Sequence, residues 1–529
     1  MSLPRRRAAL AASPWTLAFA ATALLLAVLH LADLGGSPPG LYNDEASIGY
    51  NAWAIAHHGV DEHGARFPLF FEAFGEFKNP VYIYALAPFT WFLPLTPYVV
   101  RLPAALFGLA FCAAAAAMAW QLTRSRLVTW LTLVTAGIEP WLVQDSRLGF
   151  EVISMVAMLM VALWCIARAQ RDGAVSWFGW AGVALALSVL GYSTGRVFGV
   201  VLFAVVAVSF LVPGVQRIWT WLWMLPGLAV VYAALLLYNA RTPGALTGRF
   251  DILSIAWDHP TFGTLLGRFF SNYLTYWGVP FLFTRGDPNL RHNPGLGGML
   301  LVTTLPVIVL GAGICIARIR RDAFCRILVL GAVAAPVPAA ATAEGTPHSL
   351  RAALMLPFLV AFSVYGWHLL AGVLATRRVV ALAVAAAVCV EAGAFFYDLY
   401  VQYPGRALAY FDAGQGDAIV RAAQLAGGRH VIYLSTSLDN AYIQALFRFR
   451  LDPNTYVRDG LEPLHMRVED PSSIAADAQP GDYMVLMPND ELPAQARVVD
   501  IERATVDNGP AEVQQPDTRV ETLAVVARR

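Results

Sequence analysis

Two adjacent acidic residues, Asp44 and Glu45, follow directly on the first long apolar segment of the chain. Carboxylates at the edge of a membrane are costly to desolvate unless they are paired or used in chemistry. One of them could take a proton from a hydroxyl group, which is the task of a general base. A purely structural role is the alternative, because an aspartate at a helix start accepts hydrogen bonds from backbone N–H groups.

The only lysine of the chain, Lys78, lies later in the loop that contains Asp44 and Glu45. All other strongly basic residues are arginines. The aromatic stretch 80–97 follows Lys78, and such a stretch is typical of a membrane–water interface. An ammonium group there could neutralise the phosphate of a lipid. The alternative is an ordinary interfacial lysine that only extends toward the headgroups.

The elements that must position these residues are membrane-spanning helices. The 529 residues are 57% hydrophobic and 14% charged, and their mean hydropathy is +0.55. Soluble chains carry about 25% charged residues, so the composition predicts an integral membrane protein. About eleven apolar stretches are long enough to cross: 14–34, 101–122, 127–143, 150–169, 176–192, 197–213, 218–238, 297–317, 325–343, 351–374 and 378–397.

The connections between these stretches predict the side of each loop. If 80–97 stays in the interface, because its prolines interrupt a helix, every second connection is basic: Arg5–Arg7, Arg124–Arg126, Arg168–Arg171, Arg217, Arg318–Arg326 and Arg377–Arg378. Basic loops stay in the cytoplasm. We therefore expect a cytoplasmic N-terminus and a first helix that is retained rather than cleaved as a signal peptide. The outer loops are then 35–100, 144–149, 192–196, 239–296 and 344–350.

Residues 398–529 form a more polar and more acidic tail. Val431–Leu434, Tyr483–Met487 and Leu523–Val526 have the short apolar pattern of buried strands, and 438–449 has that of a helix. We expect a transmembrane domain over 1–397 and a small α/β domain over 398–529 on the outer side. The five cysteines show no disulfide or zinc spacing, and a net charge of +1 gives no reason to expect nucleic acid.

Several short motifs together resemble the GT-C glycosyltransferases that take a sugar from a polyprenyl-phosphate carrier. That group includes the protein O-mannosyltransferases and the bacterial lipid A aminoarabinose transferase. The motifs here are Asp44–Glu45, Lys78–Pro80, Arg101–Gly108, Asp145–Arg147, Phe281–Asp287 and Pro347–Arg351. Their order and predicted sides agree, and the resemblance covers most of 30–360. Asn79 departs from the mannosyltransferase pattern.

The resemblance implies a role for each polar residue of these motifs. Asp44 would be the catalytic base, with Glu45 orienting the acceptor or supporting Asp44. Asp145 would be a second carboxylate facing the same cavity, or else the partner of Arg147 in a salt bridge. Cationic groups would bind the lipid phosphate and stabilise the charge on the leaving group. First in order are Lys78, His348 and Arg351, followed by Arg285, Arg147, Arg196, Arg291 and His292.

The expected protein is thus a polytopic α-helical membrane protein of GT-C-like fold in the bacterial inner membrane, with interfacial helices in 35–100. The resemblance implies an inverting, metal-independent glycosyltransferase. It would move a sugar from an undecaprenyl-phosphate-type carrier to an envelope glycan, lipid or protein on the periplasmic face. We expect no cofactor. No DxD-type nucleotide-sugar motif stands on the cytoplasmic side, so a nucleotide-sugar donor is not expected. The alternatives are a transporter or lipid-linked-sugar flippase and a non-catalytic membrane scaffold.

Overall fold

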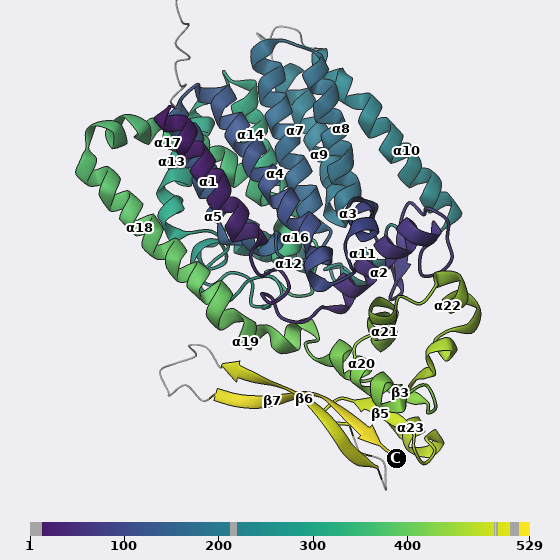
Figure 1. Ribbon diagram of the computed structural model, residues 1–529. Coiled ribbons are helices and arrows are strands. Elements are labelled where there is room, and N and C mark those ends of the chain that lie inside the picture. Colours follow the sequence, from purple (N-terminus) through teal and green to yellow (C-terminus); the bar gives the residue numbers. More distant parts are fainter. Residues whose placement is uncertain (1–12, 212–218, 491, 493–495, 508–517) are drawn as a thin grey trace, which may run out of the picture.

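Figure 1 shows the computed structural model as a bundle of helices with a smaller domain below it; residues 13–211, 219–490, 492, 496–507 and 518–529 are described. Within these ranges, eight helices are long and apolar enough to cross a membrane. They are α1 (Pro14–Leu31), α4 (Pro97–Thr123), α7 (Val152–Asp172), α9 (Ser193–Leu211), α10 (Leu225–Arg241) with the turn before it, α14 (Ala323–Ala334) with α15 (Val337–Ala340), α17 (Met355–Thr376) and α18 (Arg378–Tyr397).

Three shorter apolar helices complete the bundle: α5 (Arg126–Ile138), α8 (Ser176–Gly191) and α13 (Leu305–Arg318). The predicted apolar stretches and these helices follow each other in the same order along the chain. The fold class expected from the sequence is therefore confirmed. Arg5–Arg7 and Arg217, which contributed to the predicted topology, lie outside the described residues.

The first long loop folds back to the end of the bundle that carries the C-terminal domain, which we call the domain end. It contains α2 (Asn43–His58), a hairpin of β1 (Phe71–Ala73) and β2 (Glu76–Lys78), and α3 (Pro80–Phe92). The 13 residues of α3 fall short of the ~20 that a crossing needs. The chain therefore enters α4 from the same end at which it left α1, as the exclusion of 80–97 from the spans requires.

The other predicted outer loops reach the same end. Arg196, at the start of α9, donates a hydrogen bond to Asn79 of the first loop at 2.6 Å. The N–H of Ser349 donates to Asp287 of the long loop after α10 at 2.7 Å. At the opposite end, Gln170 in the last turn of α7 donates a hydrogen bond to Asp322, which precedes α14, at 3.3 Å. The two sets of loops thus gather at opposite ends of the bundle.

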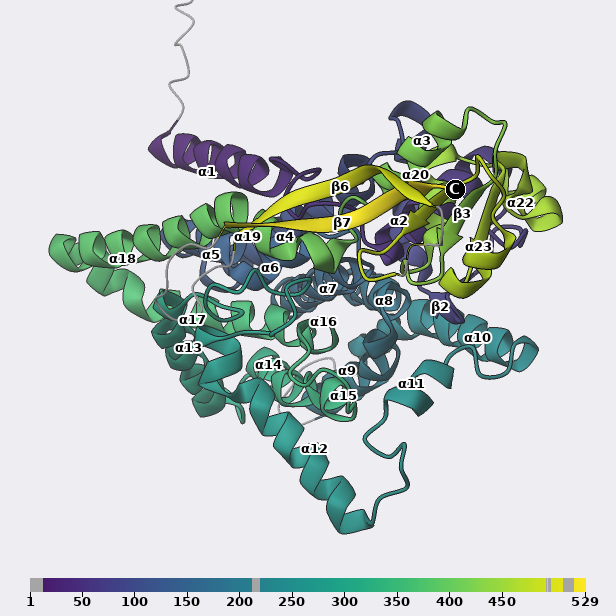
Figure 2. The same ribbon diagram turned by 90° about the horizontal axis from the view of Figure 1, so that it is seen from below.

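The loop between α10 and α13 contains α11 (Gly248–Leu253), α12 (Phe262–Trp277) and a π-helical turn, η2 (Pro280–Thr284). In Figure 2, α12 projects from the body of the molecule. Its apolar side chains Phe262, Phe270 and Leu274 are exposed. A helix with one exposed apolar face is typical of segments that lie in a membrane interface.

The C-terminal domain contains a five-stranded mixed sheet in the order β4-β3-β5-β7-β6. Its strands are β3 (Ile432–Ser435), β4 (Met466–Glu469), β5 (Tyr483–Leu486), β6 (Arg497–Asp507) and β7 (Thr518–Arg528). Helices α20 (Gln415–Ala426), α21 (Ala441–Phe449), α22 (Pro453–Asp459) and α23 (Pro471–Asp477) accompany them. The expected α/β domain is present. The helical stretch that begins with α18 continues through the short helix α19 (Tyr403–Ala407) to Phe411, so the predicted boundary at 397 lies inside it.

A buried ion pair fastens the first loop to the bundle. Glu45 on α2 and Arg101 on α4 are both 0% exposed, and the guanidinium Nε and Nη2 donate to the carboxylate at 2.7 and 2.6 Å. Arg101 also donates to the carbonyl groups of Leu34, Pro38 and Gly40. The N–H of Gly149 donates to Glu45 at 2.7 Å. One pair of side chains therefore joins α2, α4 and two loops.

We expect Glu45→Ala to lower the thermal unfolding temperature of the purified protein strongly. Loss of one partner leaves a buried charge without compensation, which costs about 3–5 kcal/mol. The double variant Glu45→Ala/Arg101→Ala should lose less than the sum of the two single variants, because neither charge is then left alone. Asp459→Ala, which breaks the exposed pair with Arg458, is the control and should change little. Strictly additive losses at Glu45 and Arg101 would contradict the coupling.

Candidate active site

Asp44 lies one residue before Glu45, in the first turn of α2. Its side chain is 34% exposed, and one carboxylate oxygen accepts a hydrogen bond from Lys78 Nζ at 2.5 Å. Lys78 is the last residue of β2 and is buried, with its ammonium 5.1 Å from the centre of the Phe74 ring. The two residues singled out first in the sequence, 34 positions apart, therefore form one ion pair.

The negative charges around Lys78 explain why its ammonium group can be buried. Burial acts against the ammonium, but the carboxylates of Asp44, Glu151 and Glu62 outweigh it, and the pKa of Lys78 is raised. Lys78 therefore stays protonated at neutral pH. A positive charge therefore stands beside Asp44 in the candidate site.

Glu151 is a further acid of this site that the sequence analysis did not select. It precedes α7, and one of its oxygens accepts a hydrogen bond from the N–H of Asn79. The amide oxygen of Asn79 accepts from Arg196 at 2.6 Å. Burial raises the pKa of Glu151 from 4.5 to about 7, against the opposing charge of Lys78. The signal that could have revealed it is an acid between Phe150 and Val152, at the outer end of a predicted span.

Tyr192 lies between α8 and α9, among the outer-loop residues of the candidate site. Its burial raises the pKa of the phenol to about 12, and four charged groups act on the same hydroxyl: Arg351, Glu151, Asp44 and Asp145. Three of these four, Asp44, Asp145 and Arg351, are predicted site residues. Residues from the first, second and last outer loops thus lie close enough to Tyr192 to act electrostatically on its hydroxyl.

The predicted cations differ in their surroundings. Arg351 is buried and donates to the side chain of Glu344 at 3.1 Å and to its carbonyl oxygen at 2.8 Å. Arg291, from the long loop, lies over the ring of Tyr42 at 4.1 Å. Tyr42 is two positions before Asp44 in the sequence. Arg285 is exposed at the surface of that loop. Arg196 contacts the Phe70 ring as well as Asn79.

Arg147, unlike the other predicted phosphate-binding arginines, has a guanidinium group that is fully occupied by the protein itself. It is 0% exposed and donates to the carbonyl groups of Ser37, Ala32 and Asp33. Its guanidinium also lies over the Tyr400 ring at 4.8 Å. These contacts join the loop after α1 to the segment after α18. The carboxylate of Asp145 makes no hydrogen bond within the described residues, so the alternative role of Asp145, as the salt-bridge partner of Arg147, is not realised.

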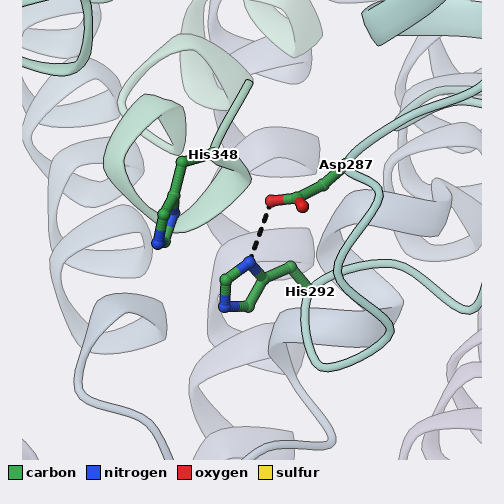
Figure 3. A group of neighbouring side chains, drawn as sticks. All are labelled: Asp287, His292 and His348. Carbon is green, nitrogen blue, oxygen red and sulfur yellow. Dashed lines mark hydrogen bonds and ion pairs between the residues drawn. The ribbon is translucent and has the colours of Figure 1, made fainter. Parts of the chain in front are cut away.

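A second cluster contains the only group of described side chains that is suited to hold a metal ion: Asp287, His292 and His348. The sequence predicts both histidines as phosphate ligands, whereas Asp287 is only part of one of the motifs. The ring of His292 contacts the ring of His348 at 4.4 Å between centroids, and its Nδ1 lies 2.9 Å from Asp287 Oδ2. Figure 3 shows the three side chains together.

No protein-family model and no curated protein matches the sequence. Solved structures match the fold along most of the chain. ArnT from Cupriavidus metallidurans bound to undecaprenyl phosphate superposes with a TM-score of 0.56 at 16% identity, over 98% of this chain and 98% of that one. The apo state of the same protein gives a TM-score of 0.57 at 15% identity, over 97% of both chains.

An archaeal enzyme shares the architecture more distantly. The oligosaccharyltransferase of Archaeoglobus fulgidus, tethered to an acceptor peptide, superposes with a TM-score of 0.52 at 11% identity. The match covers 89% of this chain and 68% of that chain. ArnT and this oligosaccharyltransferase both have the GT-C fold. The present chain therefore has the GT-C fold, as the resemblance of its motifs predicted.

Proposed function

We propose that the protein is an inverting glycosyltransferase that uses a polyprenyl-phosphate-linked sugar as donor. The observation that carries the proposal is the ion pair between Asp44 and Lys78 at the domain end of a GT-C fold. Asp44 and Arg351 both act electrostatically on the hydroxyl of Tyr192. The bound undecaprenyl phosphate of ArnT supports a donor of this class. The acceptor is a hydroxyl group of an envelope glycan, lipid or protein.

The chemistry needs one base and a stabilised leaving group. Asp44 takes the proton of the acceptor hydroxyl while its oxygen attacks the anomeric carbon of the sugar. The bond from that carbon to the phosphate oxygen breaks, and the lipid phosphate leaves with the electron pair. Because attack and departure occur on opposite faces of the sugar, the configuration inverts. Lys78, Arg351 and Arg291 supply the positive charge that the departing phosphate needs.

The remaining acids of the site have supporting roles in this proposal. Glu45 is committed to Arg101 and positions the first turn of α2 rather than reacting. Glu151 holds the Asn79 backbone, which follows Lys78 directly, and so positions the lysine. The polar cluster lies at one end of the bundle among loop residues. Transport sites in membrane proteins lie near the middle of broken helices instead, which favours the transferase over a transporter or flippase.

The membrane side follows from the basic loops. We infer that the domain end faces the periplasm of a bacterial inner membrane, since the connections at the opposite end carry Arg124, Arg126, Arg168 and Arg171. The N-terminus is then cytoplasmic and the C-terminal domain periplasmic. A deletion strain should accumulate a polyprenyl-phosphate monosaccharide, measured by mass spectrometry of extracted lipids. An unchanged lipid pool together with unchanged envelope glycans would contradict the proposed function.

We predict that Asp44→Asn leaves the protein folded and abolishes transfer. The substitution keeps the shape of the side chain and removes its ability to take a proton, and loss of a positioned base costs roughly 10²–10⁴-fold in rate. The measurement is clearance of the accumulated donor lipid in the deletion strain that expresses the variant. Glu72→Gln, an exposed acid on β1 of the same loop, is the matched control and should restore clearance fully. Normal clearance by Asp44→Asn would exclude Asp44 as the base.

We predict that Arg351→Ala weakens binding of undecaprenyl phosphate in nanodiscs by roughly 10- to 150-fold. A hydrogen bond to a charged group contributes about 1.5–3 kcal/mol, and each 1.4 kcal/mol is a factor of ten in affinity. Arg429→Ala, an exposed arginine in the C-terminal domain, should bind the lipid like the wild type. Equal affinities of all three proteins would remove Arg351 from the phosphate site.

Another prediction concerns the pH dependence of stability and Glu151. Its pKa is about 7 in the folded protein against 4.5 ordinarily, so the folded state holds a proton that the unfolded state releases. The stability from this neutral carboxyl is fully present below about pH 4.5 and is lost as the pH rises through 7. The unfolding temperature of the wild type should therefore fall more between pH 5.5 and 8 than that of Glu151→Gln, as measured by intrinsic fluorescence. Parallel curves for the two proteins would show that Glu151 titrates normally.

A further inference from the structure

Three side chains that the proposed transfer does not require meet beside the candidate site. Asp287 and His292 belong to the loop after η2, and His348 precedes the short helix α16 (Ser349–Ala352). One potential ligand atom of each residue lies within 4.8 Å of the others. Figure 3 shows the carboxylate and the two imidazole rings around a common space. Two segments that are more than 50 residues apart in the sequence therefore offer one oxygen and two nitrogen atoms to a single point.

Hydrogen bonds to the backbone hold these residues in place. Asp287 accepts from the N–H of Ser349 at 2.7 Å through Oδ2 and from the N–H of Asn289 at 2.9 Å through Oδ1. The N–H of His348 donates to the hydroxyl of Tyr276 at 3.3 Å. Asp287 and His292 are only 3% and 6% exposed. The arrangement is thus fixed by the fold on both sides of the cluster, which is the preorganisation that a metal site needs.

Asp145 is a further buried acid at the domain end of the bundle. Its side chain is 0% exposed, and within the described residues neither of its oxygens has a hydrogen-bond partner. The buried Arg147 donates to backbone carbonyl groups instead, and the buried Arg351 donates to Glu344. Neither arginine therefore pairs with Asp145.

We propose that Asp287, His292 and His348 bind a divalent metal ion of the zinc class at the domain end of the bundle. Two imidazole nitrogens and one carboxylate oxygen are a ligand set that suits Zn²⁺ and neighbouring transition metals rather than Mg²⁺ or Ca²⁺, which prefer oxygen ligands alone. Three protein ligands leave at least one coordination position open for water or another oxygen ligand. The ion also compensates the negative charge of its carboxylate ligand, Asp287.

The resemblance of the sequence motifs implied an enzyme without a metal ion, whereas the proposed site binds one. This site does not rest on the proposed transfer, because metal binding can be measured on the purified protein without donor or acceptor. The bond-making step proposed above runs through Asp44, which belongs to a different cluster. Failure of the metal proposal would therefore leave the transferase proposal intact, and the reverse is also true.

The test is a titration of the full-length protein in detergent after treatment with a chelator. Co²⁺ is the first probe, because its visible absorption reports nitrogen and oxygen ligation, and Zn²⁺ then competes for the same site. We expect one equivalent of either ion per chain, a Co²⁺ spectrum that Zn²⁺ removes, and a higher unfolding temperature in the presence of Zn²⁺. Mg²⁺ at the same concentration should produce none of these changes.

Substitutions of the three proposed ligands test whether they bind the ion. His292→Ala and His348→Ala should each weaken Zn²⁺ binding by about 100-fold or more, because loss even of groups that only support a ligand costs 10–100-fold. His259→Ala removes an exposed histidine from the same long loop and should bind like the wild type. Asp287→Asn keeps the size of the side chain and provides a variant that retains hydrogen-bonding capacity if an alanine variant fails to fold.

Two results would overturn the proposal. One is the absence of stoichiometric Co²⁺ and Zn²⁺ binding to the wild type, which would leave a hydrogen-bonded Asp–His pair only. The other is binding that survives unchanged in His292→Ala, His348→Ala and Asp287→Asn, which would place the ion elsewhere. Stoichiometric binding that is lost in these variants and kept in His259→Ala supports the site.

Discussion

The buried ion pair between Glu45 and Arg101 determines where the candidate site lies. Neither side chain is exposed, so each charge is tolerable only while the other is present. The pair fixes the start of α2 against α4, and through Gly149 and the carbonyl groups of Leu34, Pro38 and Gly40 it fixes two loops as well. Asp44 precedes Glu45 directly, so the position of the proposed base follows from a neighbour that does no chemistry itself.

The C-terminal domain holds the same helix from the other side. The N–H of Asn43 donates to Asp412, and Gln444 of α21 donates to the carbonyl group of Leu41 at 2.7 Å. The hydroxyl of Tyr50 donates to the carbonyl group of Leu451 at 2.6 Å. The domain therefore packs directly on the helix that carries Asp44. Function is expected to depend on this contact, because a site holds its geometry only when its supporting elements are rigid.

The sequence predicted the features that depend on local composition. Apolar runs predicted the spanning helices, and prolines indicated that α3 does not span. The types and order of Asp44, Lys78 and Arg351 predicted a candidate site, whose function stays a proposal. Pairings between distant residues could not be inferred in this way. Glu45 looks as catalytic as Asp44 until Arg101 is seen beside it. Arg147 looks like the partner of Asp145 until the fold turns it toward the Ser37 carbonyl group. Glu151 and the cluster around Asp287 appear only when separate loops meet.

We propose that groups from the first and last outer loops bind one lipid phosphate at the domain end of the bundle. The most direct measurement is a cryo-electron microscopy structure of the full-length protein in nanodiscs with undecaprenyl phosphate. The claim predicts a phosphate within hydrogen-bonding distance of Lys78 or Arg351, on the same side of the bundle as Asp44. A phosphate bound at the opposite end, near Arg124 or Arg168, or beyond the reach of both Lys78 and Arg351, would contradict it.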